Sequence, residues 1–420
     1  MPEERSYLCV DLKSYYASVE CVERGLDPLS ARLVVADPER TEKTICLAVS
    51  PAMKKLGVRN RCRVFEIPKH IEYIMAKPRM ALYMDYAARI YGIYLRYVSE
   101  EDIHVYSIDE VFMDITDYCG ARGLTPKAFA AELLHEIYRC TGLTATCGLG
   151  SNLYLAKIAL DIMSKRTPDH IGILSEESYR EELWQHRPLT DFWRVGPATQ
   201  RRLERLGIRC MAEIASANED VLYQNFGIDA ELLIDHAWGR EPTTMADIKS
   251  FCPRSKSLSR GQILASEYDY SHGRIVVREM AEDLALELFE HGMEAASVGL
   301  SLGYSYRGER APAQGSIGLE LHSSSVKLLA DTAQTLYDRV MARDDTIRRI
   351  NLCYGGVRER QSMQYDLFLG SEAQLREERL QRAMVNIRKK YGKNGLLKCM
   401  DLQEGATAIE RNRQIGGHRA

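Results

Sequence analysis

The chain has 420 residues, which is enough for two to four domains. Its 56 Lys and Arg nearly balance its 59 Asp and Glu, and the resulting net charge of −3 excludes a protein coated all over with basic residues for binding nucleic acid. A composition of 45% hydrophobic and 27% charged residues excludes the disordered and collagen-like classes. We expect no membrane partner and a cytoplasmic location, since neither a membrane-spanning run nor a signal-like N-terminus is recognisable.

Residues 1–172 predict a split βαβ domain. Strands and helices are expected in the order β, α, β, β, α, β, followed by a last helix, over residues 7–11, 82–98, 103–106, 111–115, 126–140, 144–149 and 152–163. This order is typical of an antiparallel sheet with helices on one face. Residues 20–77 form an insertion rich in Lys and Arg, which predicts a separate small lobe.

The remainder of the chain predicts a helical domain and a second split βαβ domain. Short helical pieces alternate with Gly and Pro breaks over residues 176–240, and a turn-rich linker begins at Glu241-Pro242. The order β, α, β, β, α, β then recurs over residues 255–264, 271–289, 296–306, 316–322, 325–341 and 347–357. The tail from residue 371, with 11 Lys and Arg against 6 Asp and Glu, suits either a helix that binds DNA or a partner, or a helix packed on the body.

Three carboxylates are the candidate catalytic centre. Asp11 ends the first predicted strand, and Asp109 and Glu110 lie in the hairpin beside it. Carboxylates converging at one sheet edge repel each other unless a divalent cation lies between them, and oxygen ligands favour Mg²⁺ or Mn²⁺ over zinc. Two such ions would support phosphoryl transfer. Because Asp and Asp-Glu are also common in solvated turns, the spacing alone leaves a metal site and plain turns open.

Three long motifs resemble those of the Y-family translesion DNA polymerases. They are Cys9-Val10-Asp11-Leu12-Lys13-Ser14-Tyr15-Tyr16-Ala17-Ser18-Val19-Glu20, Tyr106-Ser107-Ile108-Asp109-Glu110-Val111-Phe112-Met113-Asp114, and Gly148-Leu149-Gly150-Ser151-Asn152 continuing to Asp161. The resemblance runs in the family's order over about the first 360 residues. The tail is similar to that of the bacterial UV-damage repair branch (UmuC/ImpB/MucB/SamB), which is related to the catalytic subunit of polymerase V.

The resemblance implies an α+β multidomain fold, the right-hand polymerase. Its domains would be a split βαβ palm (1–20 and 78–172), small fingers (21–77), a helical helix-hairpin-helix thumb (173–242), a split βαβ little finger (250–358), and a clamp-binding peptide with a tail (359–420). The implied function is template-directed, low-fidelity DNA synthesis past damaged bases during DNA repair, without proofreading. Primer-template DNA and dNTPs would be its substrates.

The resemblance also implies roles for individual residues. Asp11, Asp109, Glu110 and the backbone carbonyl of Leu12 would hold two Mg²⁺ or Mn²⁺ ions. Tyr16 would be the steric gate that leaves no room for a ribose 2′-hydroxyl. Further nucleotide contacts would come from Tyr15, Lys54 and Lys157, with Ser107 alongside. Pro51 and Lys54 stand where many members carry a Tyr and an Arg, so the positive charge is kept but the bidentate fork is lost.

Contacts to DNA and to a sliding clamp are expected outside the palm. In the thumb they would come from Gly196, Arg201 and Arg202, since a Gly turn and a helix N-terminus suit a DNA phosphate. In the little finger they would come from Lys256 and Arg260. The peptide Gln364-Tyr365-Asp366-Leu367-Phe368 resembles the clamp-binding motif of bacterial polymerases, with Gln364, Leu367 and Phe368 as its anchors.

Two other functions remain to be weighed against polymerase activity. A palm-type nucleotide cyclase can share the sheet and the paired carboxylates, but it lacks the region from residue 176 to 357. A non-catalytic accessory protein bound to the clamp or to DNA would not need the carboxylate trio. The sequence leaves open whether accessory subunits or a recombinase filament take part.

Overall fold

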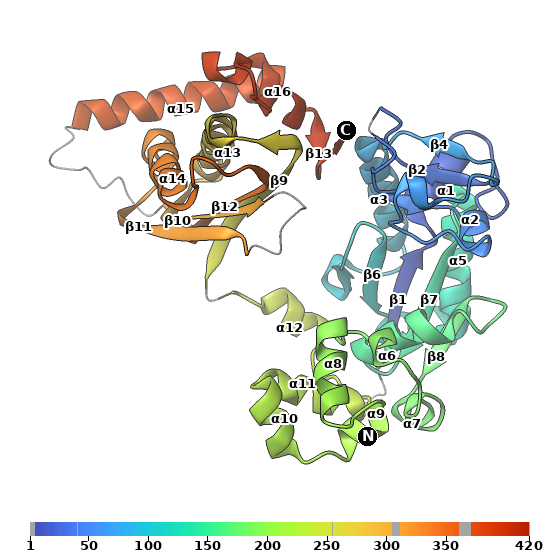
Figure 1. Cartoon of the computed structure of the whole chain (residues 1–420). Coiled ribbons are helices and arrows are strands. Elements are labelled where there is room, and N and C mark those ends of the chain that lie inside the picture. The colour runs from blue at the N-terminus through green and yellow to red at the C-terminus, as the bar shows by residue number, and fades with distance from the viewer. Residues whose placement is uncertain (1–4, 40, 254, 305–310, 361–370, 420) are drawn as a thin grey trace. The chain divides into compact units, whose positions relative to one another are not determined.

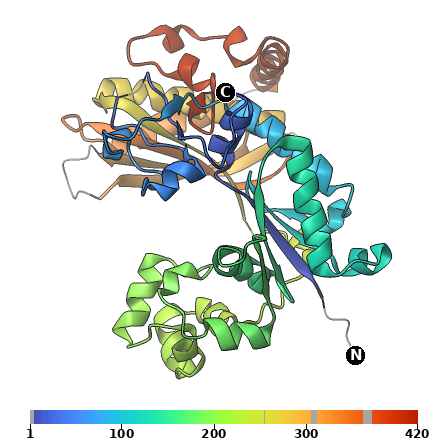
Figure 2. The same cartoon turned by 90° about the vertical axis from the view of Figure 1, so that its right-hand side faces the viewer.

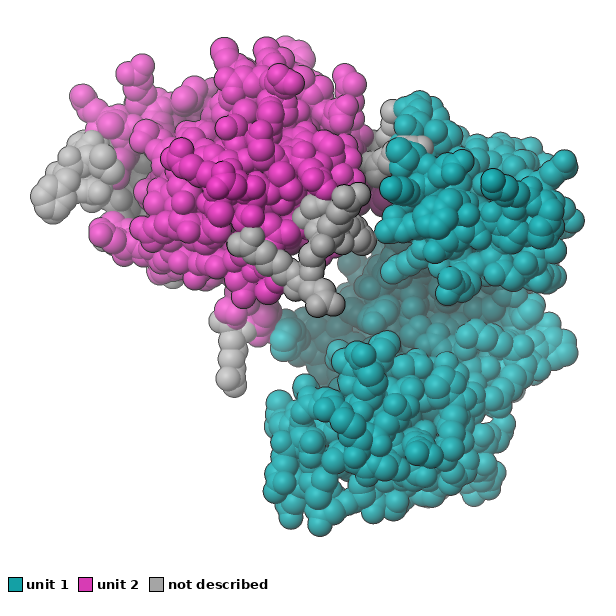
Figure 3. All heavy atoms as spheres, in the orientation of Figure 1, with its two compact units in different colours: residues 1–251 teal, residues 252–420 magenta. Residues whose placement is uncertain are grey.

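The computed structural model describes residues 5–39, 41–253, 255–304, 311–360 and 371–419. The chain divides into two compact units, residues 1–251 and residues 252–420, which Figure 3 shows in different colours. Within the described ranges, no helix is both long and apolar enough to cross a membrane.

The main sheet of the first unit has five strands in the order β5-β6-β1-β7-β8 (Figure 1). Strand β1 runs antiparallel to both of its neighbours, whereas β8 runs parallel to β7. The sequence predicts four of these strands and misses β8, which adds a parallel edge to the predicted antiparallel sheet. The strands are β1 (Tyr7–Leu12), β5 (Ile103–Val105), β6 (Glu110–Asp114), β7 (Ala145–Gly150) and β8 (Ile171–Leu174).

Helix α6 packs so closely on this sheet that its backbone touches the backbone of strand β7. A Cβ added to Gly148 would lie 2.1 Å from the carbonyl oxygen of Ala156, so the glycine permits this close approach. The predicted helix over residues 152–163 is divided into α6 and a π-helical turn η3. The helical elements of this layer are α1 (Tyr15–Val22), α3 (Met80–Tyr94), the turn η2 (Glu100–Asp102), α4 (Thr116–Arg122), α5 (Pro126–Thr141), α6 (Leu153–Ile158) and η3 (Ala159–Met163).

The insertion has a small sheet and a hydrophobic core of its own. Its strands are ordered β3-β2-β4, and its core includes Val34, Val49 and Met53. Ser50 caps the helix α2 by accepting a hydrogen bond from the backbone N–H of Met53, and Pro51 occupies the first helical position, which suits a residue without an N–H. The elements are β2 (Leu33–Val35), β3 (Ala48–Val49), α2 (Pro51–Lys55), η1 (Val64–Glu66) and β4 (Ile74–Ala76).

The region after the main sheet is helical, as the sequence predicts, and ends in a helix that the sequence does not predict. Residues after Glu241 were expected to form a linker, but α12 (Met245–Ser250) packs on the first unit, with Met245 in a buried cluster beside Tyr7 and Phe112. The other helical elements are α7 (Glu176–Leu183), η4 (Leu189–Asp191), α8 (Pro197–Arg205), α9 (Met211–Ala215), α10 (Glu219–Phe226) and α11 (Asp229–Ala237).

The second unit contains an antiparallel four-stranded sheet in the order β11-β10-β12-β9. Two helices cover one face of this sheet (Figures 1 and 2), and the order along the chain is the predicted β, α, β, β, α, β. The elements are β9 (Lys256–Tyr268), α13 (Tyr270–Glu290), β10 (Met293–Tyr304), β11 (Ala313–Ser323), α14 (Val326–Val340) and β12 (Ile347–Glu359).

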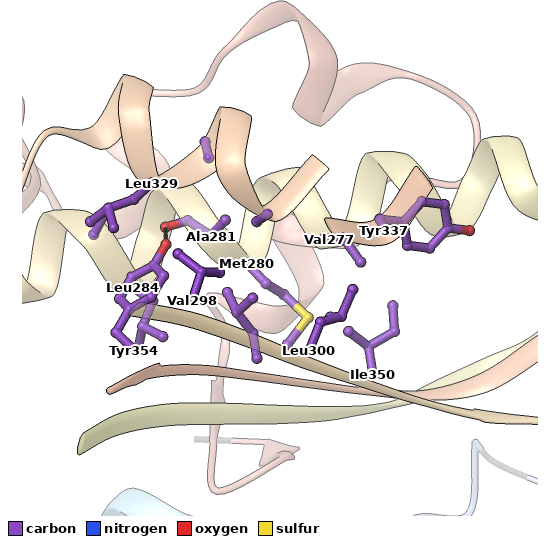
Figure 4. Packing of buried hydrophobic residues seen from close by; sticks show 14 of the residues in the cluster. Val277, Met280, Ala281, Leu284, Val298, Leu300, Leu329, Tyr337, Ile350 and Tyr354 are labelled. Carbon is purple, nitrogen blue, oxygen red and sulfur yellow. Dashed lines mark hydrogen bonds between the residues drawn. The ribbon is translucent and has the colours of Figure 1, made fainter. Parts of the chain in front are cut away.

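The core of the second unit lies between its helices and its sheet (Figure 4). Met280 and Leu284 of α13 lie over Val298 and Leu300 of β10, and all four are buried. Tyr354 of β12 donates a hydrogen bond from its hydroxyl to the backbone carbonyl of Ala281, at 2.7 Å. The tyrosine therefore buries its ring without leaving its polar atom unpaired.

The described tail packs on α13 of the second unit, as one of the two alternatives drawn from the sequence expects. Its basic residues pair with acidic residues of α13, and Arg388 lies 2.9 Å from the buried carboxylate of Asp283. Lys398 pairs in the same way with Glu282 at 2.6 Å. The elements are α15 (Ser371–Tyr391), η5 (Lys393–Gly395), η6 (Cys399–Leu402), α16 (Ala408–Arg411), β13 (Gln414–Ile415) and β14 (His418–Arg419).

Candidate active site

The three candidate carboxylates lie at the same end of the main sheet. Asp11 of β1 is paired directly with Glu110 of β6. The backbone carbonyl of Asp109 accepts a hydrogen bond from the N–H of Leu12 at 3.0 Å. Glu110 therefore begins β6, with Asp109 immediately before it, at the same end of the sheet where Asp11 and Leu12 end β1.

Burial and like charge act together on Asp11. Burial raises the pKa of its carboxyl to about 7, and the negative charges of Asp109 and Glu110 contribute to the rise. A cation next to this carboxyl would favour its charged form. The centre thus has the electrostatic property expected where carboxylates share a metal ion.

Local partners hold the other two carboxylates. Oε1 of Glu110 lies 2.8 Å from Nζ of Lys157 and accepts a hydrogen bond from the thiol of Cys9 at 3.4 Å. Asp109 accepts a hydrogen bond from the hydroxyl of Ser107 at 2.7 Å. Across the described ranges, no three His, Cys, Asp or Glu side chains are arranged closely enough to hold a metal ion. The ammonium of Lys157 instead supplies the positive charge beside Glu110.

The chemistry of the donors still fits a hard divalent cation. Asp11, Asp109 and Glu110 offer oxygen atoms only, and oxygen ligands are those that Mg²⁺ and Mn²⁺ prefer. The sheet register places Asp11 and Glu110 directly opposite each other in adjacent strands.

The two tyrosines after β1 have different environments. Tyr15 is buried and donates a hydrogen bond from its hydroxyl to the backbone carbonyl of Tyr83. Tyr16 is half-buried and stacks on the ring of Tyr83, with 4.6 Å between ring centroids and 19° between ring planes. Burial raises the pKa of Tyr16, and the negative charge of Asp109 adds to the rise.

The candidate carboxylates act on both candidate lysines, Lys54 and Lys157. Burial lowers the pKa of Lys54 on α2, while the charges of Asp11 and Asp109 act in the opposite direction. Burial also opposes the charge of Lys157, but Asp161 and Glu110 raise its pKa above the ordinary value. Lys157 also lies 3.0 Å from the carboxylate of Asp161, so its ammonium contacts two carboxylates.

The candidate thumb contacts are gathered on α8. Gly196 precedes this helix and is exposed, and a Cβ added to it would meet no atom within 4 Å. Arg201 and Arg202 are exposed, and Arg202 lies over the ring of Phe226 at 4.6 Å. The start of α8 is therefore open to a ligand.

Of the two candidate basic residues on β9, only one is free of ion pairs with other described residues and could contact DNA. Lys256 is exposed at the first position of the strand. Arg260 instead pairs with Asp283 and Glu287 of α13, and its side chain is only 24% exposed. The structure thus gives Arg260 an internal partner where the sequence predicts a DNA contact. Gln364, Leu367 and Phe368 lie outside the described residues.

A further contact near the carboxylates was not identified from the sequence. The indole N–H of Trp193 donates a hydrogen bond to the hydroxyl of Tyr106 at 3.1 Å, which joins the helical region to the hairpin that carries Asp109. Cys9, Asp161 and Tyr83 were also missed as neighbours of the site. Cys9 and Asp161 lie within the motifs quoted above, but the motifs do not show which side chains they contact.

Comparisons with known proteins extend over nearly the whole chain. Residues 10–161 match the impB/mucB/samB family, and residues 255–367 match its C-terminal domain. UvrX of Bacillus subtilis, whose name describes a UV-damage repair protein, is 30% identical over 419 residues, covering 99% of this chain and 98% of the relative. DNA polymerase IV 2 of the same organism is 28% identical, with both chains covered fully.

A solved structure shows the same fold. A chimeric Y-family DNA polymerase made from Dbh and Dpo4 superposes with a TM-score of 0.67 and 20% identity, covering 84% of this chain and 99% of the other. The expected α+β right-hand polymerase fold is thereby confirmed. The nucleotide cyclase and the accessory protein are not favoured, since the relatives matched along the chain include DNA polymerases.

Proposed function

This chain belongs to the impB/mucB/samB family, a branch of the Y-family translesion DNA polymerases, and we propose that Asp11, Asp109 and Glu110 are the catalytic centre of its DNA synthesis. As a DNA-directed DNA polymerase, it extends a primer on a DNA template with nucleotides. The direct pairing of Asp11 with Glu110 in adjacent strands is the observation that carries the proposal.

The three carboxylates and the carbonyl of Leu12 would hold two Mg²⁺ or Mn²⁺ ions. Such ions activate the 3′-hydroxyl of a primer and neutralise charge on the triphosphate and leaving pyrophosphate. The chain's own contribution is positional. Sheet hydrogen bonds hold β1 against β6, and Lys157 remains beside Glu110, where its ammonium can donate to a phosphate oxygen.

The positions of the other candidate residues suggest which part of the nucleotide or DNA each would contact. Tyr16 would lie against the sugar and exclude a 2′-hydroxyl, with Tyr15 behind it, and Lys54 would face the triphosphate from α2. Gly196 and the arginines of α8 would contact phosphates of the primer-template, and Lys256 would do so from β9. We leave Arg260 out of this set because carboxylates already neutralise it.

Primer extension on a template with one abasic site tests the proposed function. We expect Mg²⁺-dependent incorporation opposite and beyond the site, at low fidelity and with no removal of mismatched ends. Mg²⁺-independent extension would contradict the metal assignment, and failure to pass any lesion that blocks a replicative polymerase would contradict the translesion role.

The raised pKa of Asp11 predicts a pH-dependent effect of Mg²⁺ on stability. Because the folded protein binds this proton more tightly than the unfolded chain, the metal-free fold loses stability as the pH rises from about 4 through 7. A cation that needs the carboxylate should offset this loss only at higher pH. Thermal unfolding should therefore show a larger Mg²⁺-induced rise in Tm at about pH 8 than at about pH 5.5. An equal rise in the Asp11→Asn variant would contradict the assignment.

A bacterial sliding clamp is the partner proposed for residues 364–368. Replacing Leu367 and Phe368 by alanine should shorten the products made with the clamp loaded on DNA, because these side chains would fill its apolar pocket. Products made without the clamp should be unchanged, and equal shortening in both reactions would contradict the proposal. The same proposal places the enzyme in the cytoplasm, together with its DNA.

A further inference from the structure

Tyr83 lies directly behind the proposed steric gate. It belongs to α3, more than sixty residues from Tyr16, and its side chain is fully buried. Its ring stacks on the ring of Tyr16, which is the half-buried member of the pair. The face of Tyr16 that contacts Tyr83 is therefore covered by protein.

An ion-pair network around the buried carboxylate of Glu20 holds the hydroxyl of Tyr83. Its hydroxyl donates a hydrogen bond at 2.8 Å to Oε1 of Glu20, a carboxylate with no solvent exposure. Glu20 in turn accepts two hydrogen bonds from the guanidinium of Arg79, at 2.9 and 2.8 Å, and pairs with Arg24. A bidentate guanidinium contact restricts the carboxylate in both position and orientation.

The backbone of Tyr83 is held as well. Its carbonyl accepts the hydroxyl hydrogen bond of Tyr15, the residue immediately before Tyr16. The ring and the main chain of Tyr83 are thus both tied to α1, the helix on which Tyr15 and Tyr16 lie. This arrangement leaves Tyr83 little freedom to move away from Tyr16.

We infer that Tyr83 is a positioning residue that sets sugar selectivity by preventing the ring of Tyr16 from retreating. The inference rests on the proposed function, in which Tyr16 excludes ribonucleotides. A steric gate discriminates only as far as its ring resists displacement by the 2′-hydroxyl. The stacked ring of Tyr83, anchored by Glu20, supplies that resistance from within the protein.

The test compares ribonucleotide with deoxynucleotide incorporation in Tyr83 variants. In Tyr83→Leu, the ratio of kcat/KM for a ribonucleotide to kcat/KM for the matching deoxynucleotide should rise about threefold to tenfold, the effect of losing an aromatic pair. In Tyr83→Phe, which keeps the ring, the ratio should stay within about twofold of the parent. The ratio comes from one preparation, so it does not depend on the fraction of folded protein.

Tyr86 offers a matched control. It also lies on α3, is 4% exposed, and donates its hydroxyl hydrogen bond to Glu23 at 2.7 Å, but no ring contact joins it to Tyr16 within the described residues. Tyr86→Leu should leave the ratio unchanged. An equal rise in Tyr86→Leu, or no rise in Tyr83→Leu, would overturn the inference.

Tyr16→Ala separates this inference from the proposed function. If Tyr16→Ala relaxes selectivity and Tyr83→Leu does not, the inference alone fails. If Tyr16→Ala leaves selectivity unchanged, the gate itself is wrongly assigned and the inference falls with it. Should Tyr83→Leu not fold, Tyr83→Met carries the same expectation, since it also removes the aromatic face while retaining an apolar side chain.

Discussion

Replacing Asp109 by alanine is expected to lower the rate of nucleotide incorporation by at least about 10³-fold at saturating nucleotide and DNA. Asp109 supplies one of three carboxylates at the proposed centre, and its backbone also joins β6 to Leu12 at the end of β1. Alanine keeps the backbone hydrogen bond and removes only the oxygen ligands. Single-turnover extension of a labelled primer measures the effect directly.

Asp114→Asn is the matched control for this variant. Asp114 lies at the other end of β6 and accepts hydrogen bonds from the backbone and side chain of Thr116. We expect its incorporation rate to stay within about threefold of the parent, because an amide oxygen can still accept one of these bonds. If Asp109→Ala incorporated nucleotides as fast as Asp114→Asn, the centre would lie elsewhere.

The sequence predicts the six elements from β9 to β12 of the second unit one by one, and the reason is periodicity. Strands β9 to β12 are 11 to 13 residues long, and helices α13 and α14 span 21 and 15 residues, so each gives a long pattern. By contrast, β8 has four residues and α12 has six. These two elements depend on tertiary contacts, such as those of Met245 with Tyr7, which no local pattern records.

The motifs identified the carboxylates, but only the structure provides their partners. Lys157 and Glu110 belong to different motifs, and the sequence does not show that they form an ion pair. Arg260 is a second residue whose partners the sequence does not reveal. Its residue type suits a phosphate, yet two carboxylates of α13, 23 and 27 residues away, already neutralise it. Side-chain pairing of this kind depends on which residues face each other after folding.

Gly148 and Gly150 both mark the end of a strand and allow a helix to pack closely on it. A Gly-Leu-Gly run indicates a break between a strand and a helix, and the chain does change from β7 to α6 there. The structure adds that both glycines lie under α6, where a Cβ would come within 2.2 Å of its backbone. Their packing role depends on a helix position that sequence spacing does not specify.

Replacing Tyr16 by alanine is expected to raise the relative efficiency of ribonucleotide incorporation by about 10²-fold, the scale of discrimination that exclusion of one small group provides. The half-buried ring stacks on Tyr83 and follows β1, the strand that carries Asp11, so its removal is expected to open space at the proposed nucleotide site. Deoxynucleotide incorporation should fall much less than ribonucleotide incorporation rises.

Parallel extension reactions with dNTPs and rNTPs on one primer-template measure this change in selectivity. Tyr138→Ala, which removes a tyrosine 55% exposed on α5, controls for the loss of an aromatic side chain elsewhere in the same unit. Selectivity equal to that of the parent in Tyr16→Ala would show that another side chain reads the sugar.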